Sequence, residues 1–239
     1  MGAQDIFQDA ENIYVVMDHL EYGDLLTFYN NRKQDPLNGQ LTEEETRYIV
    51  RKLFEALAYL HEDIKSTHRD IKPTHLLFAD EERLSIKLSG FGNATYNVSD
   101  LSGDSGTLQY LAPEIIKGRQ YDSKVDIWSA GVMSYFLLTD RQPFGDKSSS
   151  YHQLKLAIKN HQLSFEGEEW SNVTDEAKGF LKLALTKDPQ KRPTARELLE
   201  DVWLANAVTP RRPGRLVDPT TPTPRFASKS FSPKYTSFD

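Results

Sequence analysis

The stretch of residues 124–138 constrains the fold most, because it is almost continuously apolar over the length of a helix. A helix that is apolar on every side has to be surrounded by other elements. We therefore expect this helix to lie buried inside the domain. The chain has 239 residues, enough to bury roughly 70% of the surface that its unfolded form exposes, so neither a disulfide nor a metal is needed to hold the core.

The remaining apolar pattern predicts one short strand, a hairpin and about six helices. The β-branched run at 13–17 has the length of a strand, and residues 84–88 form a second candidate strand or hairpin arm. Thr42 and Glu45 form a capping box at the start of a helix, because each side chain can bind the other residue's backbone N–H group. The apolar residues of that helix recur at spacings of three and four: Tyr48, Ile49, Leu53, Phe54, Leu57 and Leu60.

Two further helices are predicted to begin at threonines. Thr174 precedes two acidic residues and opens a helix that runs through Leu185. Thr194 and Glu197 form a second capping box, which starts a short helix toward Trp203.

The composition excludes several kinds of chemistry. The chain has no cysteine, which rules out disulfides, thiolate zinc sites and cysteine nucleophiles. No apolar run approaches the roughly 20 residues of a membrane span, and residues 1–14 are too polar for a signal peptide. The net charge of −6 argues against general nucleic-acid binding. We therefore expect a cytoplasmic or nuclear protein with neither a nucleic-acid nor a membrane partner.

Residues 208–239 differ from the body of the chain in charge and composition. They carry a net charge of +4, which leaves −10 for residues 1–207, and they hold six of the 12 prolines. Because this segment has few large aliphatic residues to bury, we expect a disordered tail after a domain spanning 1–207. Four residues that precede prolines are candidate phosphorylation sites or parts of docking segments: Thr209, Thr221, Thr223 and Ser232. Ordinary linker composition explains them equally well.

Five short motifs follow one another in a fixed order. They are HRDIKP at 68–73, GFG at 90–92, APE at 112–114, DIWSAG at 126–131 and DPQKRP at 188–193. In this order and spacing they resemble the signatures of eukaryotic protein kinases. A single three-residue match occurs by chance, whereas five ordered matches are specific.

The resemblance covers residues 10–205 and is closest to serine/threonine kinases of the calcium/calmodulin-dependent type. It implies a mainly α-helical large lobe with a remnant of the small-lobe sheet. In active members of this family, the aspartate at Asp70 accepts the proton of the substrate hydroxyl, and the lysine at Lys72 contacts the transferred phosphoryl group. A pairing of Lys72 with Thr107 is typical of the serine/threonine branch.

The resemblance also implies positions for a nucleotide. Met17 falls at the gatekeeper position, and the backbone groups of Asp18 and Leu20 would bind adenine. Asp24 lies where many relatives contact the ribose, and Leu77 would form the floor beneath the base.

A further set of matching residues is structural within the family. Glu114 would pair with a buried Arg192, and Asp126 would brace the backbone around His68. His68 and Phe91 would join the internal hydrophobic stack; because their partners in the small lobe are missing from this sequence, we expect them to face solvent or another protein.

The activation segment offers candidate regulatory sites. Arg69 is the residue that receives the activation-loop phosphate in related kinases, and a phosphate on Ser102 or Ser105 would be within its reach. A solvated polar loop without modification is the alternative interpretation.

The two residues that bind metal in active kinases are replaced. Gly90 stands in place of the aspartate of D-F-G, and His75 stands in place of the asparagine that closes the catalytic loop. Magnesium prefers oxygen ligands, so we expect no metal site, and we interpret His75 as a solvated loop histidine. Only 16 residues precede Met17, which leaves no room for a Gly-rich loop and its lysine. ATP and magnesium are expected to bind tightly only if the family activity is retained.

Three functions remain open on this basis. The first is a degenerate kinase domain, or pseudokinase, that binds other proteins such as kinases or kinase substrates, with Asp70 and Lys72 as vestiges or as weak nucleotide ligands. The second is a serine/threonine kinase seen as a truncated chain, and the third is a non-functional relic. No basic amphipathic helix typical of calmodulin targets is found in the sequence.

Overall fold

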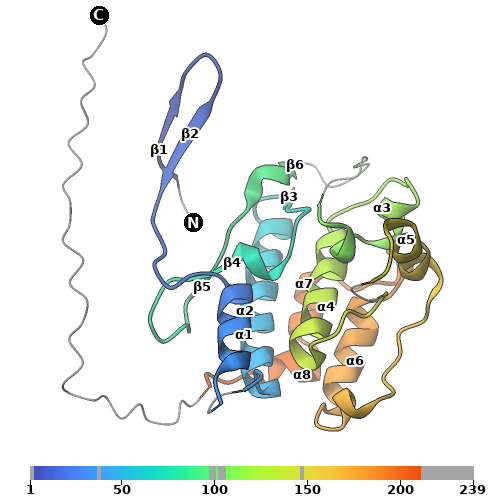
Figure 1. The fold of residues 1–239 in the computed structure, drawn as a ribbon. Coiled ribbons are helices and arrows are strands. Elements are labelled where there is room, and N and C mark those ends of the chain that lie inside the picture. The colour runs from blue at the N-terminus through green and yellow to red at the C-terminus, as the bar shows by residue number, and fades with distance from the viewer. Residues whose placement is uncertain (1–2, 37–38, 97–100, 102–105, 146–147, 211–239) are drawn as a thin grey trace, which may run out of the picture.

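The computed structural model describes residues 3–36, 39–96, 101, 106–145 and 148–210 (Figure 1). The predicted disordered tail lies outside these residues from 211 onward, and so do Thr221, Thr223 and Ser232. Thr209 is described and is exposed. None of the helices among the described residues has both the length and the apolar character needed to cross a membrane.

The described residues form eight α-helices and six short strands. The helices are α1 (Leu25–Gln34), α2 (Glu43–Glu62), α3 (Pro113–Ile116), α4 (Lys124–Thr139), α5 (Tyr151–Asn160), α6 (Asp175–Ala184), α7 (Ala195–Leu199) and α8 (Val202–Ala205). The strands pair in three antiparallel ribbons: β1 (Ala3–Gln8) with β2 (Ile13–Met17), β3 (Ser66–Thr67) with β6 (Thr95–Tyr96), and β4 (Leu76–Phe78) with β5 (Ile86–Leu88). The domain is therefore mainly helical, as expected.

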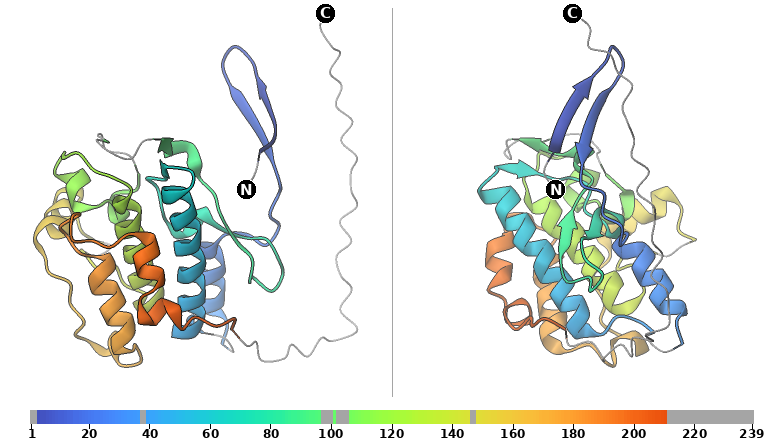
Figure 2. Two further views of the ribbon diagram at one scale, coloured as in Figure 1. Left: turned by 180° about the vertical axis from the view of Figure 1, so that it is seen from behind. Right: turned by 90° about the vertical axis from the view of Figure 1, so that its left-hand side faces the viewer.

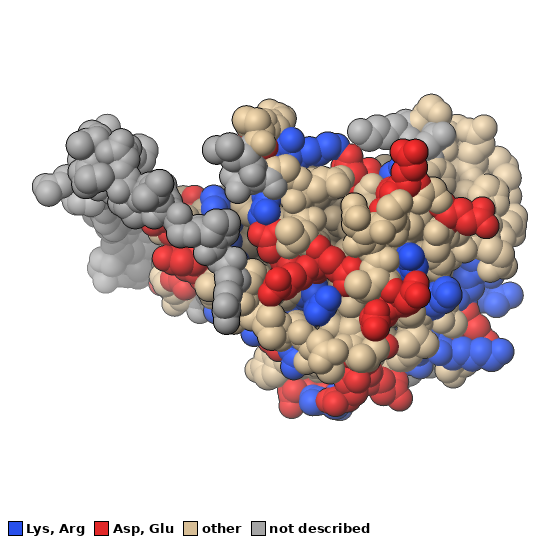
Figure 3. Space-filling view, turned by 90° about the horizontal axis from the view of Figure 1, so that it is seen from below, with Lys and Arg blue, Asp and Glu red and all other residues tan. Residues whose placement is uncertain are grey.

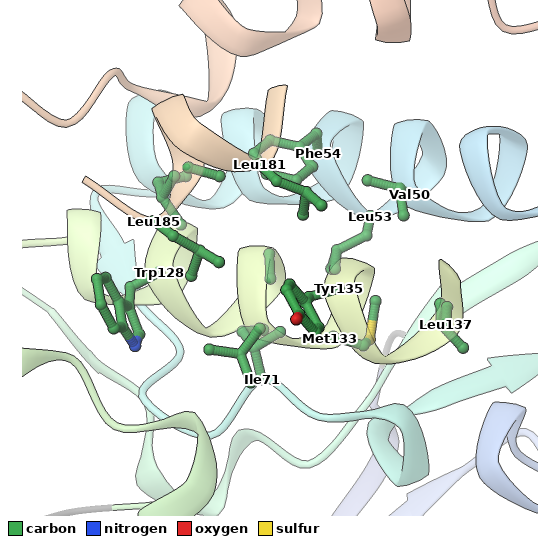
Figure 4. Close-up of a cluster of buried hydrophobic side chains, with 14 of the residues drawn as sticks. Val50, Leu53, Phe54, Ile71, Trp128, Met133, Tyr135, Leu137, Leu181 and Leu185 are labelled. Carbon is green, nitrogen blue, oxygen red and sulfur yellow. The ribbon is translucent and has the colours of Figure 1, made fainter. Parts of the chain in front are cut away.

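Helix α4 lies in the middle of the helical layer, which confirms the prediction made from its apolar sequence. It packs against α2 on one side and α6 on the other. Figure 4 shows side chains from all three helices meeting here, together with residues of adjoining loops: Val50, Leu53, Phe54, Ile71, Trp128, Met133, Tyr135, Leu137, Leu181 and Leu185. The burial of apolar side chains on most sides of α4 fixes the position of its first turn, on which the site described below depends.

The predicted helix starts are confirmed at three positions. Thr42 and Thr194 form capping boxes with Glu45 and Glu197, and Thr174 caps α6. A third capping box, between Ser150 and the glutamine three residues later, was not predicted.

The strand at 13–17 is confirmed, but its partner β1 was missed. Residues Ile6 and Phe7 of β1 pair with Val15 and Tyr14 of β2. Figure 2 shows this hairpin standing away from the helices, and every residue of β2 is exposed. A two-stranded ribbon without further strands buries little surface, so the core of the molecule lies in the helical lobe.

A buried ion pair joins two distant segments of the lobe. The Arg192 guanidinium donates to both carboxylate oxygens of Glu114 at 2.7 and 3.1 Å, and to the backbone oxygens of Thr186 and Lys124 at 2.8 Å each. The Arg192 side chain is fully buried and lies over the Trp128 ring. These contacts fix the start of α3 and the start of α4 relative to the turn before α7.

Charged side chains of both signs lie on the lower face of the lobe. Figure 3 shows acidic and basic side chains interspersed on the face of the lobe seen from below. On this face of the described residues, neither sign forms a continuous surface.

Candidate functional site

The backbone of the loop at 68–70 is bound by a side chain from the first turn of α4. The buried carboxylate of Asp126 accepts hydrogen bonds from the backbone N–H groups of His68 and Arg69, both at 2.8 Å. The same carboxylate contacts Nε2 of His61, in the last turn of α2, at 2.8 Å. Arg69 has a positive φ of 67°, a strained conformation for a long side chain, and the Asp126 bonds help to hold it.

His61 was not singled out from the sequence. It lies in the last turn of the helix that leads into the loop, and its partner Asp126 is 65 residues further along the chain, so no local pattern could have identified the contact.

His68 is completely buried, so the expectation that it faces solvent is wrong. Its Nε2 contacts the backbone oxygen of Ser89 at 2.8 Å, and its Nδ1 accepts from the N–H of Asp70 at 3.3 Å. A neutral ring satisfies both contacts, and burial lowers the pKa of His68 despite the nearby Asp126. Phe91 packs against this ring with centroids 4.8 Å apart and is 43% exposed, as expected for that residue.

Three side chains meet above the loop. Lys72 Nζ lies 2.8 Å from Asp70 Oδ2 and donates to Thr107 Oγ1 at 3.0 Å. Thr107 Oγ1 in turn donates to Asp70 Oδ1 at 3.1 Å. Burial raises the pKa of Asp70, but the hydrogen bond and charge of Lys72, with smaller contributions from His75 and Thr107, outweigh this and lower the pKa overall. The arrangement keeps Asp70 ionised beside the Lys72 cation.

His75 is not a solvated loop histidine, which corrects the expectation from the sequence. Its side chain is 20% exposed, and Nδ1 lies 2.8 Å from the backbone oxygen of Asp70. The ring lies 3.6 Å from Asp70 Oδ2, and its centroid is 6.0 Å from that of His68. The loop's own carbonyl therefore binds the imidazole and turns it inward.

Gly90 lies directly against this imidazole. It has a φ of +80°, and a Cβ atom placed on it would lie 2.5 Å from Cγ and 2.6 Å from Cδ2 of His75, and closer still to Nδ1. Contacts this short do not occur between real atoms, so a side chain at position 90 requires His75 to move.

The residues at positions 75 and 90 do not fit magnesium. The cation needs oxygen ligands at about 2.1 Å in a near-octahedral arrangement. Gly90 has no side chain, and His75 offers an imidazole whose Nδ1 already contacts a carbonyl. Among the described residues, no group of three or more His, Asp or Glu side chains is placed to hold a metal ion.

The five positions assigned to a nucleotide fall into two groups. Asp24 and Leu77 are joined by an isolated β-bridge at the start of α1. Asp24 caps α1, because its carboxylate accepts from the backbone N–H and hydroxyl of Thr27 at 3.0 and 2.8 Å. Met17 and Asp18 are exposed at the base of the hairpin, where Met17 pairs with Ala3 and Asp18 accepts a hydrogen bond from Gln4. Leu20 follows them half-buried.

Arg69 lies beside the activation segment. Its Nε donates to the backbone oxygen of Asn93 at 2.6 Å. Ser102 and Ser105 lie outside the described residues, so their phosphorylation stays a prediction.

A helical lobe that carries an aspartate, a lysine and a threonine on a loop braced by a buried carboxylate has the architecture of the large lobe of protein kinases. The comparisons with known proteins give the same class: the family model of the protein kinase domain matches residues 2–204. The chain therefore belongs to the protein kinase family.

Similar curated proteins are protein kinases by name. Serine/threonine-protein kinase 33 of Bos taurus is 36% identical over 226 residues, 90% of this chain and 45% of that protein. A probable myosin light chain kinase of Dictyostelium discoideum is 34% identical, covering 87% of this chain and 58% of that protein. Calcium-dependent protein kinase 3 of Plasmodium yoelii yoelii is 38% identical, covering 83% and 36%. The chain thus spans about half the length of these relatives, or less.

Proposed function

We propose that this protein kinase-family domain acts as a protein-binding or regulatory pseudokinase, with little or no phosphotransfer of its own. The observation that supports this most directly is the pair of residues at the metal positions. Gly90 supplies no ligand, and the His75 imidazole lies against it with Nδ1 on the Asp70 carbonyl. The proposal does not depend on where the chain begins.

Loss of the metal ligands has a large effect on phosphoryl transfer. The protein contributes little covalent chemistry to this reaction and accelerates it by positioning the phosphates and neutralising their charge. Metal ions supply several kcal/mol of that stabilisation. Their loss corresponds to a rate at least about a thousandfold lower.

An exposed apolar surface supports the protein-binding part of the proposal. The end of α2, the β5 strand and the segment around β6 enclose an open groove of about 580 Å³. Its lining includes Tyr59, Ile64, Phe91 and Tyr96, which are between 38% and 73% exposed. Leu88 also lines the groove and is buried. Grouped apolar side chains of this kind are typical of surfaces that bind other proteins.

A serine/threonine kinase is the second candidate function. It is favoured by the contacts among Asp70, Lys72 and Thr107, which would position a substrate hydroxyl, and by the names of the relatives. This candidate requires that phosphoryl transfer proceed with one metal ion or none. The kinase candidate therefore has to explain how the reaction proceeds without oxygen ligands at positions 75 and 90, whereas the pseudokinase does not.

A phosphotransfer assay separates the two candidates. The whole chain is incubated with labelled ATP, a mixture of serine- and threonine-containing peptides, and either magnesium or manganese. The matched control is Asp70→Ala. We expect incorporation into the peptides to equal that of the control with either cation. Turnover that Asp70→Ala abolishes would overturn the proposal and establish the kinase. A cooperative melt of the same preparation would argue against a relic that does not fold stably.

A further inference from the structure

We infer that His75 and Gly90 form an interlocked pair, in which the imidazole fills the volume that a side chain at position 90 would occupy. The pair as a unit, rather than either residue alone, then determines whether the loop admits a divalent cation. The inference deepens the proposed function. Its packing part is independent of that function, whereas its cation part rests on it.

The contact between the two residues carries the inference. A Cβ atom at position 90 would overlap three atoms of the His75 ring, including Cγ at 2.5 Å and Cδ2 at 2.6 Å. Such overlap is relieved cheaply only when the neighbour is the end of a flexible side chain. Cγ is the first ring atom and moves only when χ1 or the backbone of His75 changes.

His75 has little freedom to move away. Its backbone oxygen accepts hydrogen bonds from the N–H of Ser89 at 2.8 Å and from the Ser89 hydroxyl at 3.0 Å. Its own N–H donates to the Lys72 oxygen at 3.0 Å, and Nδ1 is bound to the Asp70 oxygen. Because Ser89 precedes Gly90, the bonds that fix His75 also tie it to the segment that carries the glycine.

The backbone conformation of Gly90 has to be separated from the overlap. Its φ of +80° would by itself disfavour an alanine, at a cost of roughly 1–2 kcal/mol. Gly118 has a φ of +63° with no atom within 4 Å of its virtual Cβ. Substitution of Gly118 therefore measures the backbone cost without the overlap, and it serves as the matched control.

One consequence is that the oxygen ligands of the family cannot be restored singly. Gly90→Asp introduces a carboxylate into the volume of the imidazole. His75→Asn adds an amide oxygen and removes the two outer ring atoms, so that the shorter side chain can turn about χ1 out of that volume. Aspartate tolerates positive φ better than most residues, so the backbone does not prevent the exchange. The double variant is expected to accept a cation that neither single variant binds.

The first test is a thermal double-mutant cycle without nucleotide or metal. Gly118→Ala should lower Tm by about 2–8 °C, and Gly90→Ala should lower it by at least about 4 °C more than Gly118→Ala does. The fall in His75→Ala/Gly90→Ala should be smaller than the sum of the single falls by at least about 4 °C, whereas His75→Ala/Gly118→Ala should be additive within about 2 °C. Additivity in both pairs would overturn the inference. If Gly90→Ala alone does not fold, a cooperative melt of the His75→Ala/Gly90→Ala chain supports the interlock, and its absence overturns it.

The second test concerns the cation. Tm is measured with ATP in the presence of magnesium and in the presence of EDTA for Gly90→Asp, His75→Asn and the double variant. We expect a magnesium-dependent increase of at least about 2 °C in the double variant alone. The same increase in Gly90→Asp alone, or in none of the three, would overturn the cation part. Failure of the proposed function is a different result, namely turnover by the unaltered chain.

Discussion

The two ends of the catalytic loop differ in what their side chains do. At the inner end, Asp126 binds two backbone N–H groups and His61 and so anchors the loop. At the outer end, His75 and Gly90 stand where metal ligands are expected, and they contact each other and the loop's own backbone. The comparison teaches that contacts needed for folding are present, while the oxygen ligands needed only for the reaction are replaced by a packing contact.

The largest expected effect is at the buried ion pair of the lobe. Arg192→Ala leaves the Glu114 carboxylate buried without its cation, and we expect the free energy of unfolding to fall by about 3–5 kcal/mol. Urea denaturation measures the change. Lys191→Ala is the control, because that side chain is 79% exposed and should change stability by less than about 0.5 kcal/mol. Equal effects of the two variants would show that the buried ion pair with Glu114 does not stabilise the lobe.

The next effect is at the anchor of the loop. Asp126→Asn keeps one acceptor oxygen and turns an NH₂ group toward a backbone donor, so one N–H group loses its partner. We expect a loss of about 2–3 kcal/mol by urea denaturation. Asp175→Asn is the control, since its side chain is 98% exposed. A loss below 1 kcal/mol would show that the loop does not depend on this carboxylate.

A smaller effect that depends on pH is expected at Glu43. Burial raises the pKa of this carboxyl group, but hydrogen bonds from Thr174, Trp203 and Arg47 outweigh it and lower the pKa overall. A lowered pKa in the folded state stabilises the fold above the pKa of the unfolded chain, about 4.3, and this contribution disappears as the pH falls through the folded value. Glu43→Gln should therefore destabilise by about 1–2 kcal/mol at pH 7 and by progressively less below about pH 4.

Urea denaturation midpoints of the unaltered chain and of Glu43→Gln, measured between pH 7 and pH 3, give the difference in stability at each pH. A constant difference over the whole range would contradict the role of the ionised carboxylate in joining α2 to α6 and α8.

The smallest effect is expected at the outer edge of the site. Thr107→Val removes one hydrogen bond to Asp70 and one from Lys72, all on partly exposed side chains. We expect a loss below about 1 kcal/mol by urea denaturation, with Thr107→Ser as the control that keeps the hydroxyl. A loss as large as that of Asp126→Asn would show that the Thr107 hydroxyl contributes to folding as much as the Asp126 anchor does. The contrast between the anchor and the solvent-facing part of the site would then disappear.

The parts of the fold that the sequence predicted are determined by local pattern. The capping boxes at Thr42 and Thr194 involve residues three apart, and the apolar run at 124–138 needs burial wherever it lies. The strand β1 was missed because half of its six residues, AQDIFQ, are polar, in no regular alternation, and they become a strand only through pairing with β2. The capping box at Ser150 was missed because it follows a run of polar residues in which several serines could start a helix.

The orientation of His75 depends on a contact between segments that are far apart in the sequence. Leu76 pairs with Leu88 in the β4–β5 ribbon, and this register places residue 75 beside residues 89 and 90. The sequence analysis identified a strand at 84–88 but did not assign its partner. Without the pairing to residues 76–78, His75 and Gly90 could only be interpreted as two separate replacements of metal ligands. The contact between them could not be predicted.

The most direct test of the account is a thermal-shift titration of the unaltered chain with ATP, once with magnesium and once with EDTA. Because neither position 75 nor position 90 offers an oxygen ligand, we predict the same Tm at every ATP concentration in both series. A Tm that rises further with ATP and magnesium than with ATP and EDTA would contradict the account, since it would require a cation site at the nucleotide despite His75 and Gly90.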